Sequence, residues 1–454
     1  METEKHSLIL SYSEYSIKKL IMRITTICFV LFSALSVFGQ PFEVGHTTIT
    51  FNDPARTGGF GTGGGPGRQI QTEIYYPADI AGNDVNLSSG EFPVIVFGHG
   101  FAMGWGAYSN IWEELIPQGF ILAFPRTEGG LFPAPSHAEF GLDLSLIVTK
   151  INNEGTLASS LFFNHISTKS ALMGHSMGGG AMVLAAENNT NITTVIGLAP
   201  AETNPSAIAA ATNVSVPALI FSADQDLVTP AIDHHIPIYN GLASSCKYFI
   251  NIIGGAHCYY ANSNFNCDFG ESTSGGNISI SRSQQQIIMF RYVLPWLNIY
   301  LYDDCDEHSV FETDLALDAE VSNQSSCTGF PVPTYDVTVS VNNGTLTSAE
   351  LAGIYQWVDC DNGNSEIPGA TNQSYTVTQN GNYAVVLGTG SCAQISNCFA
   401  VASVGINQLE LNSTNKELIQ IVDLMGRETQ LHLNTPLIFI YSDGTRERLM
   451  KMEF

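Results

Sequence analysis

One serine of the chain lies in a pattern that could make it a nucleophile. The pattern is GHSMG at residues 174–178, a Gly-x-Ser-x-Gly motif that occurs once. It follows the apolar run 170–173 and precedes a glycine-rich helical start. A tight strand-to-helix turn needs small residues on both sides of the serine and exposes the hydroxyl above the sheet. The helix N-terminus behind it can stabilise an oxyanion. We therefore predict that Ser176 is a nucleophile rather than a helix cap.

A serine hydroxyl is a weak nucleophile, so a base and an orienting carboxylate must accompany it. In a strand-turn-helix framework these follow the serine in the order Asp or Glu, then His. Asp226 comes just after the strand-like run 217–223, and His257 ends the next run. Both lie where an open parallel sheet gathers its active site. Asp224 is the rival acid; Asp226 is preferred because Asp-x-x-x-Pro after a strand is the usual presentation, which leaves Asp224 as a turn residue.

Two backbone N–H groups are expected to form the oxyanion hole. One belongs to Met177, the residue after the nucleophile, and the other lies in a loop after an earlier strand. The apolar run 93–97 leads into such a loop, so we assign the second N–H to Phe101, with the side chain of His99 supporting the loop. Trp105 and Tyr259 are close to these loops in sequence and are candidates to line a substrate subsite, although aromatic residues are as often part of a core.

No metal site is predicted. The paired histidines at 234–235 lack a partner at metal-ligand spacing, and no cysteine lies in a CxxC pair. The acidic stretches 303–308 and 359–366 do not fit the calcium-loop pattern. We expect chemistry that needs no metal and no cofactor.

The elements that would position these residues alternate along residues 40–302. Several strand-like runs are continuously apolar, which is typical of parallel strands covered on both faces. Helical patterns lie between them, and a long one closes the region at 282–301. This order predicts an α/β fold with a doubly wound, mostly parallel sheet. The expected strands are 70–76, 93–99, 120–126, 170–176, 193–200, 217–224 and 247–255.

The remainder of the chain has a different composition. Between Arg291 and Lys416 there is no Lys or Arg, and short alternating runs predict a small β-sandwich over residues 333–404. Residues 303–332 are expected to be a linker, although Cys305 and Cys327 could tie it to another part of the chain. Basic residues return in a third unit of strands, 405–454.

The N-terminal residues 1–39 are interpreted as a signal peptide. The apolar run 24–38 follows basic residues and ends in small ones. It is shorter than the roughly 20 residues that span a membrane, and no second run of spanning length follows. Residues 1–21 are unusually acidic for such a segment and could be a start-site extension. We expect an exported protein with no integral membrane segment after the signal is removed.

Composition excludes one class of partner and points to one compartment. The 454 residues carry a formal charge of −25, which would repel nucleic acid. Eight cysteines follow residue 39, an even number that favours disulfides in an oxidising compartment. We predict a Cys258–Cys267 bridge, and Cys360 paired with either Cys392 or Cys398.

With these motifs in place, residues 42–301 resemble the serine α/β-hydrolases. The GHSMGG turn, the His-Gly-Phe loop, the late Asp-x-x-x-Pro and the GG-x-H strand end are similar to the chlorophyllase, dienelactone-hydrolase and cutinase-like polyester-hydrolase group. Dienelactone hydrolases use a cysteine nucleophile, so Ser176 favours the esterase side. The resemblance implies hydrolysis of carboxylic esters without metal or cofactor.

The C-terminal part carries a second resemblance. The IVDLMGR turn, the NTPL strand start and the YSDGT turn in residues 418–454 are similar to C-terminal sorting signals of the type IX secretion system of Bacteroidetes. The preceding module resembles Ig-like domains found between enzyme and tail in such proteins. The resemblance implies that the type IX machinery is a partner and that the protein is secreted or held at the outer cell surface.

We therefore expect a secreted serine hydrolase of small-molecule or polymeric esters with an open site, since no long insertion precedes Asp226. One alternative is an extracellular peptidase or amidase on the same fold. The other is a surface adhesion protein whose Ig-like module functions while the hydrolase domain is a scaffold. A scaffold needs none of the three predicted catalytic residues, which argues against the last alternative.

Overall fold

The computed structural model describes residues 41–187, 189–330, 332–351, 353–388, 390–402 and 417–450. The predicted signal peptide lies outside the described residues. The chain divides into two compact units. The first contains the residues up to Thr334 together with Thr389–Cys392, and the second contains Tyr335–Gly388 and the residues from Ala393 onward.

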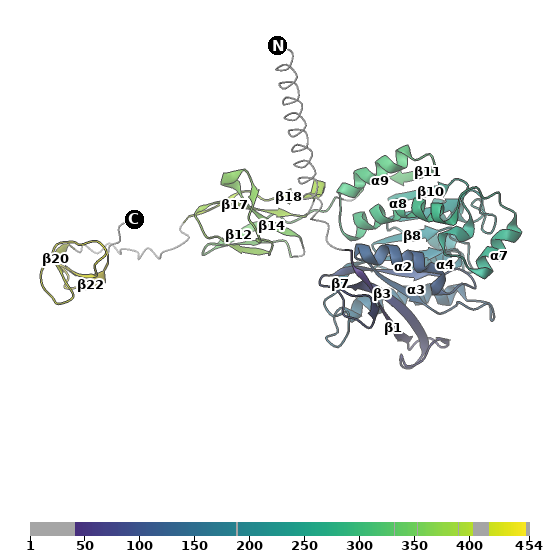
Figure 1. Ribbon diagram of the computed structural model, residues 1–454, viewed down its shortest axis with the longest axis horizontal. Coiled ribbons are helices and arrows are strands. Elements are labelled where there is room, and N and C mark those ends of the chain that lie inside the picture. The colour runs from purple at the N-terminus through teal and green to yellow at the C-terminus, as the bar shows by residue number, and fades with distance from the viewer. Residues whose placement is uncertain are drawn as a thin grey trace, which may run out of the picture. The chain divides into compact units, whose positions relative to one another are not determined.

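The first unit is built on a large mixed sheet whose centre is parallel (Figure 1). The parallel strands lie in the order β6 (Ile121–Pro125), β5 (Phe92–Gly98), β7 (Ile166–His175), β8 (Thr194–Leu198), β9 (Ala218–Ala223) and β10 (Cys246–Ile252). Antiparallel strands extend it at both ends: β3 (Arg68–Ala78) and β1 (Glu43–Asp53) beside β6, and β11 (Val321–Cys327) beside β10. The short strands β2 (Gly59–Phe60) and β4 (Gly82–Asn83) pair with β3 and β1. The predicted α/β fold with a mostly parallel sheet is confirmed.

Helices cover both faces of this sheet, as the continuously apolar strands predict. Along β5 the side chains alternate between two cores: Val94 and Val96 pack into one, and Ile95 and Phe97 into the other. The first core is closed by α3 (His137–Glu154), α4 (Met177–Ala186), α5 (Ala207–Ala211) and α6 (His235–Gly241). The second is closed by α2 (Ser109–Leu115), α8 (Arg282–Leu301) and α9 (Asp306–Leu317). Every residue of β5 is buried, which explains why no polar alternation marks it.

Shorter elements complete the first unit. They are the 3₁₀ turns η1 (Trp105–Tyr108), η2 (Ile116–Gln118) and η3 (His257–Tyr260), the helix α7 (Phe265–Ser274) and the turn η5 (Gly390–Cys392). Both η3 and α7 follow β10, so they lie in the same set of loops as the predicted catalytic residues.

The expected linker 303–332 is wrong as a description of this segment. It contains α9, whose Phe311 and Leu315 enter the second core, and β11, which pairs with β10 along its length. The pairing has a physical cause, because the outer edge of β10 presents N–H and C=O groups that need partners. Five of the seven β11 residues are exposed polar or small side chains, so no apolar alternation indicated a strand.

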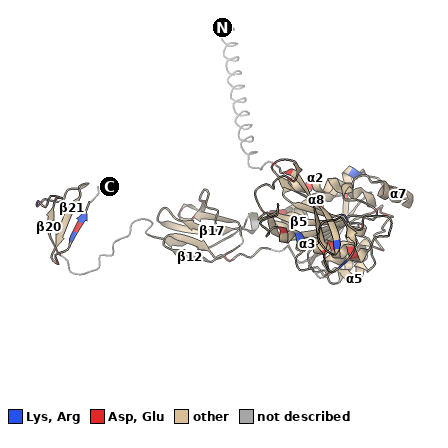
Figure 2. Ribbon diagram, turned by 90° about the horizontal axis from the view of Figure 1, so that it is seen from below, with Lys and Arg blue, Asp and Glu red and all other residues tan. Residues whose placement is uncertain are grey.

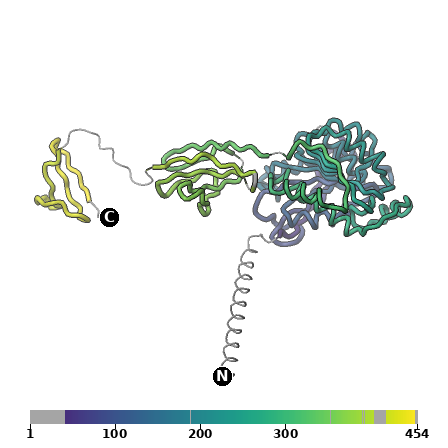
Figure 3. Tube along the Cα trace, turned by 90° about the horizontal axis from the view of Figure 1, so that it is seen from above, coloured from purple at the N-terminus to yellow at the C-terminus, as the bar shows by residue number. Residues whose placement is uncertain are grey.

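The second unit contains only strands and short turns among its described residues (Figures 1 and 3). One sheet has the order β12 (Val339–Asn342), β13 (Thr345–Ser348), β16 (Ser374–Thr376). The other contains β15 (Ser365–Glu366), β14 (Tyr355–Asp359), β17 (Gly381–Leu387), β18 (Gln394–Ile395) and β19 (Phe399–Val401), with η4 (Cys360–Asn362) after β14. Both sheets share a core around Trp357. The strands of these two sheets carry no Lys or Arg, and no blue is seen on β12 or β17 in Figure 2.

A separate three-stranded sheet forms near the C-terminus. It consists of β20 (Leu418–Val422), β21 (Leu437–Tyr441) and β22 (Arg446–Leu449), all antiparallel. Strands were predicted in this part of the chain, and the structure has them.

Four disulfides join the eight cysteines after residue 39. They are Cys246–Cys327, Cys258–Cys267, Cys305–Cys392 and Cys360–Cys398. The predicted Cys258–Cys267 bridge is confirmed, and Cys360 takes Cys398, one of its two expected partners. Within the described ranges no helix is both long enough and apolar enough to cross a membrane. No cluster of metal-ligating side chains is found in the same ranges.

Candidate active site

The turn between β7 and α4 holds Ser176 in a strained backbone conformation. Its φ is 55° and its ψ is −122°, a region that residues with a side chain rarely adopt and that is common at functional sites. The flanking glycines are required by close packing. A Cβ at Gly174 would lie 2.4 Å from the carbonyl oxygen of Gly178, and one at Gly178 would lie 2.1 Å from that of Gly98. The strand-turn-helix context predicted for the motif is therefore present.

Three predicted side chains meet above this turn in a continuous hydrogen-bonded row. His257 Nε2 lies 2.9 Å from Ser176 Oγ, and His257 Nδ1 lies 2.7 Å from Asp226 Oδ2. All three residues are buried, with Ser176 the most accessible at 8%. Because Asp226 accepts at Nδ1, that nitrogen carries the proton and Nε2 is free to accept one from the serine. The arrangement can remove the serine proton and stabilise the imidazolium that results.

The carboxylate of Asp226 is held by its own turn. Its Oδ1 accepts the N–H groups of Val228 and Thr229 at 3.0 and 2.8 Å, and its Oδ2 accepts the Thr229 hydroxyl at 3.0 Å. Burial opposes ionisation, but the neighbouring His257 and these hydrogen bonds hold the pKa of the carboxyl below its usual value. The rival Asp224 instead accepts the N–H of Gly254 at 2.7 Å. The structure therefore brings Asp226, and not Asp224, to the histidine.

A second row of polar side chains behind Asp226 was not identified from the sequence. The Thr229 hydroxyl lies 3.0 Å from His235 Nε2, whose Nδ1 lies 2.9 Å from Ser222 Oγ. His235 is fully buried, and burial lowers its pKa to about 3, so it is neutral. It donates to Thr229, which donates to Asp226. Only the spacing Asp-x-x-Thr within the Asp-x-x-x-Pro segment could have indicated this support.

His175, inside the motif itself, connects the base to the predicted oxyanion loop. Its Nε2 donates to the carbonyl of His257 at 3.0 Å, and its Nδ1 accepts from the Tyr108 hydroxyl at 2.9 Å. Tyr108 accepts the N–H of Gly100 at 2.7 Å. Burial lowers the pKa of His175 to about 3, which keeps the ring neutral and fixes this direction of donation. The role of His175 and Tyr108 depends on the fold, so the motif alone did not reveal it.

The two backbone groups expected to form an oxyanion hole are positioned by these contacts. Met177 is the first residue of α4, where an N–H has no partner within the helix. The N–H of Gly100 is bound to Tyr108, while that of Phe101 has no partner among the hydrogen bonds of the described residues. His99 supports the loop as predicted, with its ring nitrogens 3.0 and 2.9 Å from the carbonyl oxygens of Gly100 and Thr127.

The sequence was compared with known protein families and with curated proteins. Residues 33–306 match the model of the PETase family, described as PET hydrolase-like. The chain belongs to the PET hydrolase-like family. Among curated proteins, a bis(hydroxyethyl) terephthalate hydrolase of Streptomyces coelicolor is 24% identical over 273 residues, which are 60% of this chain and 71% of that protein. Cutinase 1 of Thermobifida cellulosilytica is 27% identical over 225 residues, which are 49% of this chain and 74% of that protein.

A third relative, the cutinase est1 of Thermobifida alba, is 27% identical over 228 residues, 50% of this chain and 66% of its own. The names of these relatives share one kind of chemistry, the hydrolysis of esters. This PET hydrolase-like protein is an ester hydrolase.

In this PET hydrolase-like protein, the backbone next to His257 is held by contacts that the sequence motifs did not predict. Glu271 of α7 is buried and accepts the N–H of Cys258 through Oε2 at 2.6 Å. The Cys258–Cys267 disulfide ties the same residue to α7. Arg282 of α8 donates to the carbonyl of Cys258, to the carbonyl of Ala261 at 2.7 Å and to Asp268 Oδ1 at 2.5 Å. The backbone beside His257 is therefore fixed from both its N–H and its C=O.

The two aromatic residues expected to line a substrate subsite contact other side chains of the protein. Trp105 donates from Nε1 to the Tyr75 hydroxyl at 3.1 Å and lies under Arg126. Tyr259 lies under the guanidinium of Arg282. Both side chains are partly buried, and their role toward a substrate stays a prediction.

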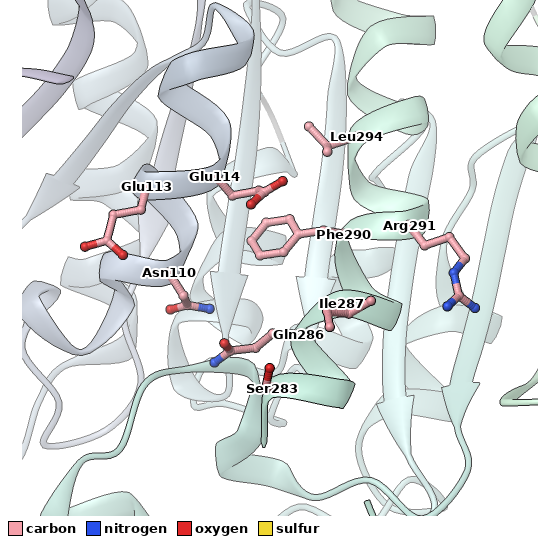
Figure 4. A pocket seen from close by; sticks show the side chains of 9 residues that line it. All are labelled: Asn110, Glu113, Glu114, Ser283, Gln286, Ile287, Phe290, Arg291 and Leu294. Carbon is pink, nitrogen blue, oxygen red and sulfur yellow. The ribbon is translucent and has the colours of Figure 1, made fainter. Parts of the chain in front are cut away.

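A hollow of about 540 Å³ lies between α2 and α8. Figure 4 shows Asn110 of α2 near Gln286 of α8, and Glu114 of α2 pointing toward Phe290 of α8. Its lining contains none of the residues predicted for catalysis, so we assign no chemistry to it.

Proposed function

We propose that this protein is a secreted serine hydrolase that cleaves carboxylic esters, with polyesters as its substrate class. Ser176 is the nucleophile, His257 the general base and acid, and Asp226 the residue that orients the imidazole. One observation carries the proposal: the row Ser176 Oγ, His257 Nε2, His257 Nδ1, Asp226 Oδ2 is continuous at 2.9 and 2.7 Å. A hydroxyl in contact with a base that is itself oriented by a carboxylate is the arrangement that activates a serine.

Acylation follows from the positions of these atoms. As Ser176 Oγ attacks the ester carbonyl, its proton passes to His257 Nε2, and the imidazolium is stabilised by Asp226 at Nδ1. The carbonyl oxygen becomes an oxyanion, for which we assign the N–H groups of Met177 and Phe101 as donors. When the tetrahedral intermediate collapses, His257 returns the proton to the alcohol oxygen, which leaves.

Deacylation repeats these steps with water. His257 takes a proton from a water molecule, whose oxygen attacks the acyl carbon, and the acid product leaves as Ser176 regains its proton. No atom in this sequence requires a metal or a cofactor.

The choice of polyesters is supported by the names of the relatives, which are a terephthalate ester hydrolase and several cutinases. It is also supported by the position of the serine at the edge of the sheet, where no segment between β8 and β9 beyond the short α5 covers it. We propose ester substrates that are bulky or polymeric.

For the remaining parts we propose export functions. Residues 1–39 act as the signal peptide, 333–404 form an Ig-like module, and 405–454 form the sorting domain that the type IX secretion machinery recognises. Support comes from the two-sheet core around Trp357, the antiparallel strands β20–β22, and four disulfides suited to an oxidising compartment. Fractionation of cells producing the full chain or a chain ending at residue 404 tests this: retention of only the shorter chain in the periplasm is expected, and equal export of both contradicts it.

The catalytic proposal is tested with the full-length chain. Ser176→Ala should reduce kcat on p-nitrophenyl esters of C2 to C16 acids by on the order of 10³-fold or more, because the nucleophile is lost. Ser160→Ala is the matched control, since this serine lies in the turn before β7 at the opposite end of the sheet. Turnover of an anilide is measured in parallel. Retained ester turnover in Ser176→Ala, or preference for the anilide, would contradict an ester hydrolase that uses this serine.

A further inference from the structure

Large apolar side chains are exposed in the loops that follow the carboxyl ends of the parallel strands. Phe101 follows β5, Leu131 and Phe132 follow β6, Ile232 follows β9, and Phe265 and Phe269 follow β10 on α7. Phe132 is 95% exposed and Phe265 is 82% exposed. These six residues, which we call the apolar rim, lie at the edge of the sheet that holds Ser176, because carboxyl ends of parallel strands share one edge.

Two aromatic residues of this rim, Phe265 and Phe269, lie together on α7. Phe265 and Phe269 are four residues apart, so they project from the same side of the helix. Their rings are stacked, with centroids 6.3 Å apart and planes 20° from parallel, although Phe269 is 62% exposed. Two adjacent rings present a flat apolar surface to solvent.

The opposite side of α7 is fixed against the residue that follows the catalytic histidine. Glu271 binds the N–H of Cys258, and the disulfide joins Cys258 to Cys267. Asp268 is paired with Arg282, which also binds the carbonyl of Cys258. The helix cannot turn its aromatic side inward without breaking these contacts. The exposed pair is therefore held at a constant position next to His257.

Charge indicates what this surface can bind. Two acids near the rim are paired with arginines within the fold, Asp268 with Arg282 and Glu128 with Arg68, while Asp233 beside Ile232 is exposed. The whole chain nevertheless carries a formal charge of −25, which opposes approach to an anionic surface such as a membrane of acidic lipids. An apolar rim on an acidic protein fits an apolar surface without charge.

We propose that the apolar rim adsorbs the protein to the surface of a solid, uncharged polyester, and that Phe265 and Phe269 are its anchor. Because α7 is tied to Cys258, the residue after His257, adsorption through α7 brings ester bonds of the polymer to the nucleophile. Aromatic rings contribute large contact areas at little cost in side-chain entropy. The inference rests on the proposed function for its substrate class, and it assigns a binding role to Phe265 and Phe269, which take no part in the chemistry.

The experiment measures adsorption separately from catalysis. Full-length Ser176→Ala is incubated with particles of amorphous poly(ethylene terephthalate), with and without the added pair Phe265→Ser and Phe269→Ser. The pair should weaken the apparent Kd for the particles by about tenfold or more, since two exposed rings lose their apolar contact. When Phe265→Ser and Phe269→Ser are introduced into the parent protein, which keeps Ser176, turnover of a soluble p-nitrophenyl ester should stay within about twofold of the parent's value.

The matched control places serines at the opposite edge of the sheet. Ile80 and Leu157 precede β5 and β7 and are also exposed, Ile80 by 67%. Ile80→Ser with Leu157→Ser should adsorb as the parent does. Unchanged adsorption of the α7 variant, equal loss in the control, or equally tight binding of the parent to vesicles of phosphatidylglycerol would each overturn the proposal. Sedimentation that shows a dimer dissociated by the α7 substitutions would overturn it as well.

The two proposals fail in different measurements. The proposed function is contradicted if Ser176→Ala still turns over a soluble ester, whether or not the protein adsorbs to the particles. The rim proposal is contradicted by the adsorption of the Ser176→Ala variants, a measurement that requires no turnover. Melting temperatures of all variants are compared to establish that α7 remains folded.

Discussion

The two ends of the parallel strands in the first unit make their turns from different residues. At the carboxyl ends of β5, β6, β7 and β8, residues with side chains adopt positive φ: Ala102 at 53°, Glu128 at 59°, Ser176 at 55° and Ala199 at 44°. Such angles are costly for most residues other than glycine, asparagine and aspartate, and for Ala and Ser no local side-chain bond compensates. Four adjacent strands are thus followed by four strained residues.

At the amino ends of the same strands the positive φ angles fall on residues that tolerate them. Gly90 precedes β5, Gly119 precedes β6 and Asn164 precedes β7, with φ of 131°, 98° and 61°. Glycine and asparagine adopt these angles at little cost. Elsewhere in the described part of this unit, positive φ outside glycine falls on Asp84, Asn164 and Asp303, which tolerate it. The positive φ angles of Ala, Glu and Ser are concentrated at the edge where the proposed chemistry occurs, and the packed sheet behind that edge has to hold them.

Gly178→Ala should have the largest effect. A Cβ there would lie within 2.5 Å of two backbone carbonyl oxygens, of Gly98 and His99, which cannot move independently of the oxyanion loop. We expect a loss of unfolding free energy of about 3 kcal/mol or more, together with loss of ester turnover. Urea unfolding followed by circular dichroism measures the first.

Gly106→Ala is the control for this prediction, since no atom lies within 4 Å of a Cβ at that position and its φ is ordinary. It lies in η1 at the same edge and should change stability by no more than about 0.5 kcal/mol. If Gly178→Ala and Gly106→Ala both lower the unfolding free energy by equally small amounts, the backbone around Ser176 is not closely packed. The proposed difference between the two ends of the strands would then be contradicted.

Thr229→Val tests whether buried hydrogen bonds hold the strained edge in its working geometry. Valine keeps the shape but removes the hydroxyl between Asp226 and His235. We expect kcat to fall about tenfold with little change in KM, because one hydrogen bond to the orienting acid is lost and His235 Nε2 loses its acceptor.

Thr229→Ser restores the hydroxyl and should restore most of kcat, which a purely packing role would not do. A valine variant with unchanged kcat over the full pH range would show that Asp226 needs only its backbone N–H contacts.

Much of this edge could be predicted from residue order, and the reason is physical. Ser176, Asp226 and His257 each follow an apolar strand, and the carboxyl ends of parallel strands meet, so sequence order is enough to bring them together. Tyr108, His175 and His235 could not be found in this way, because their partners are distant in sequence and their burial depends on packing. The alternation of apolar and polar residues did not predict β11 for a related reason. Its backbone pairing with β10 stabilises this strand, and its mostly exposed polar side chains show no alternating pattern.

The smallest predicted effect is a dependence of stability on pH. Burial lowers the pKa of His175 and of His235 to about 3 in the folded protein, against about 6.5 in the unfolded chain. Between these values the unfolded chain binds more protons, so stability is complete above pH 6.5 and falls as the pH decreases toward 3. Each histidine should cost about 0.7 kcal/mol between pH 7 and pH 6.

His235→Gln isolates this term. Its unfolding free energy should decrease less than that of the parent over the same pH interval, by about the share of one histidine. The difference between the two proteins removes contributions from other groups, such as His46, whose pKa is raised by its hydrogen bond to Glu73 and which therefore acts in the opposite direction. Parallel curves for parent and variant would show that His235 does not resist protonation.

The strand β11 defines where the catalytic unit can be cut. A fragment ending at residue 302, the boundary that composition indicates, would lack the strand that covers β10 and would leave Cys246 as a thiol without Cys327. Its open strand edge would then be available to pair with another molecule. A fragment extended to residue 334 keeps both the strand and the bridge and leaves Cys305 as the thiol without its partner. For anyone producing the hydrolase alone, residues 303–334 therefore have to be kept, because they cover the edge of β10.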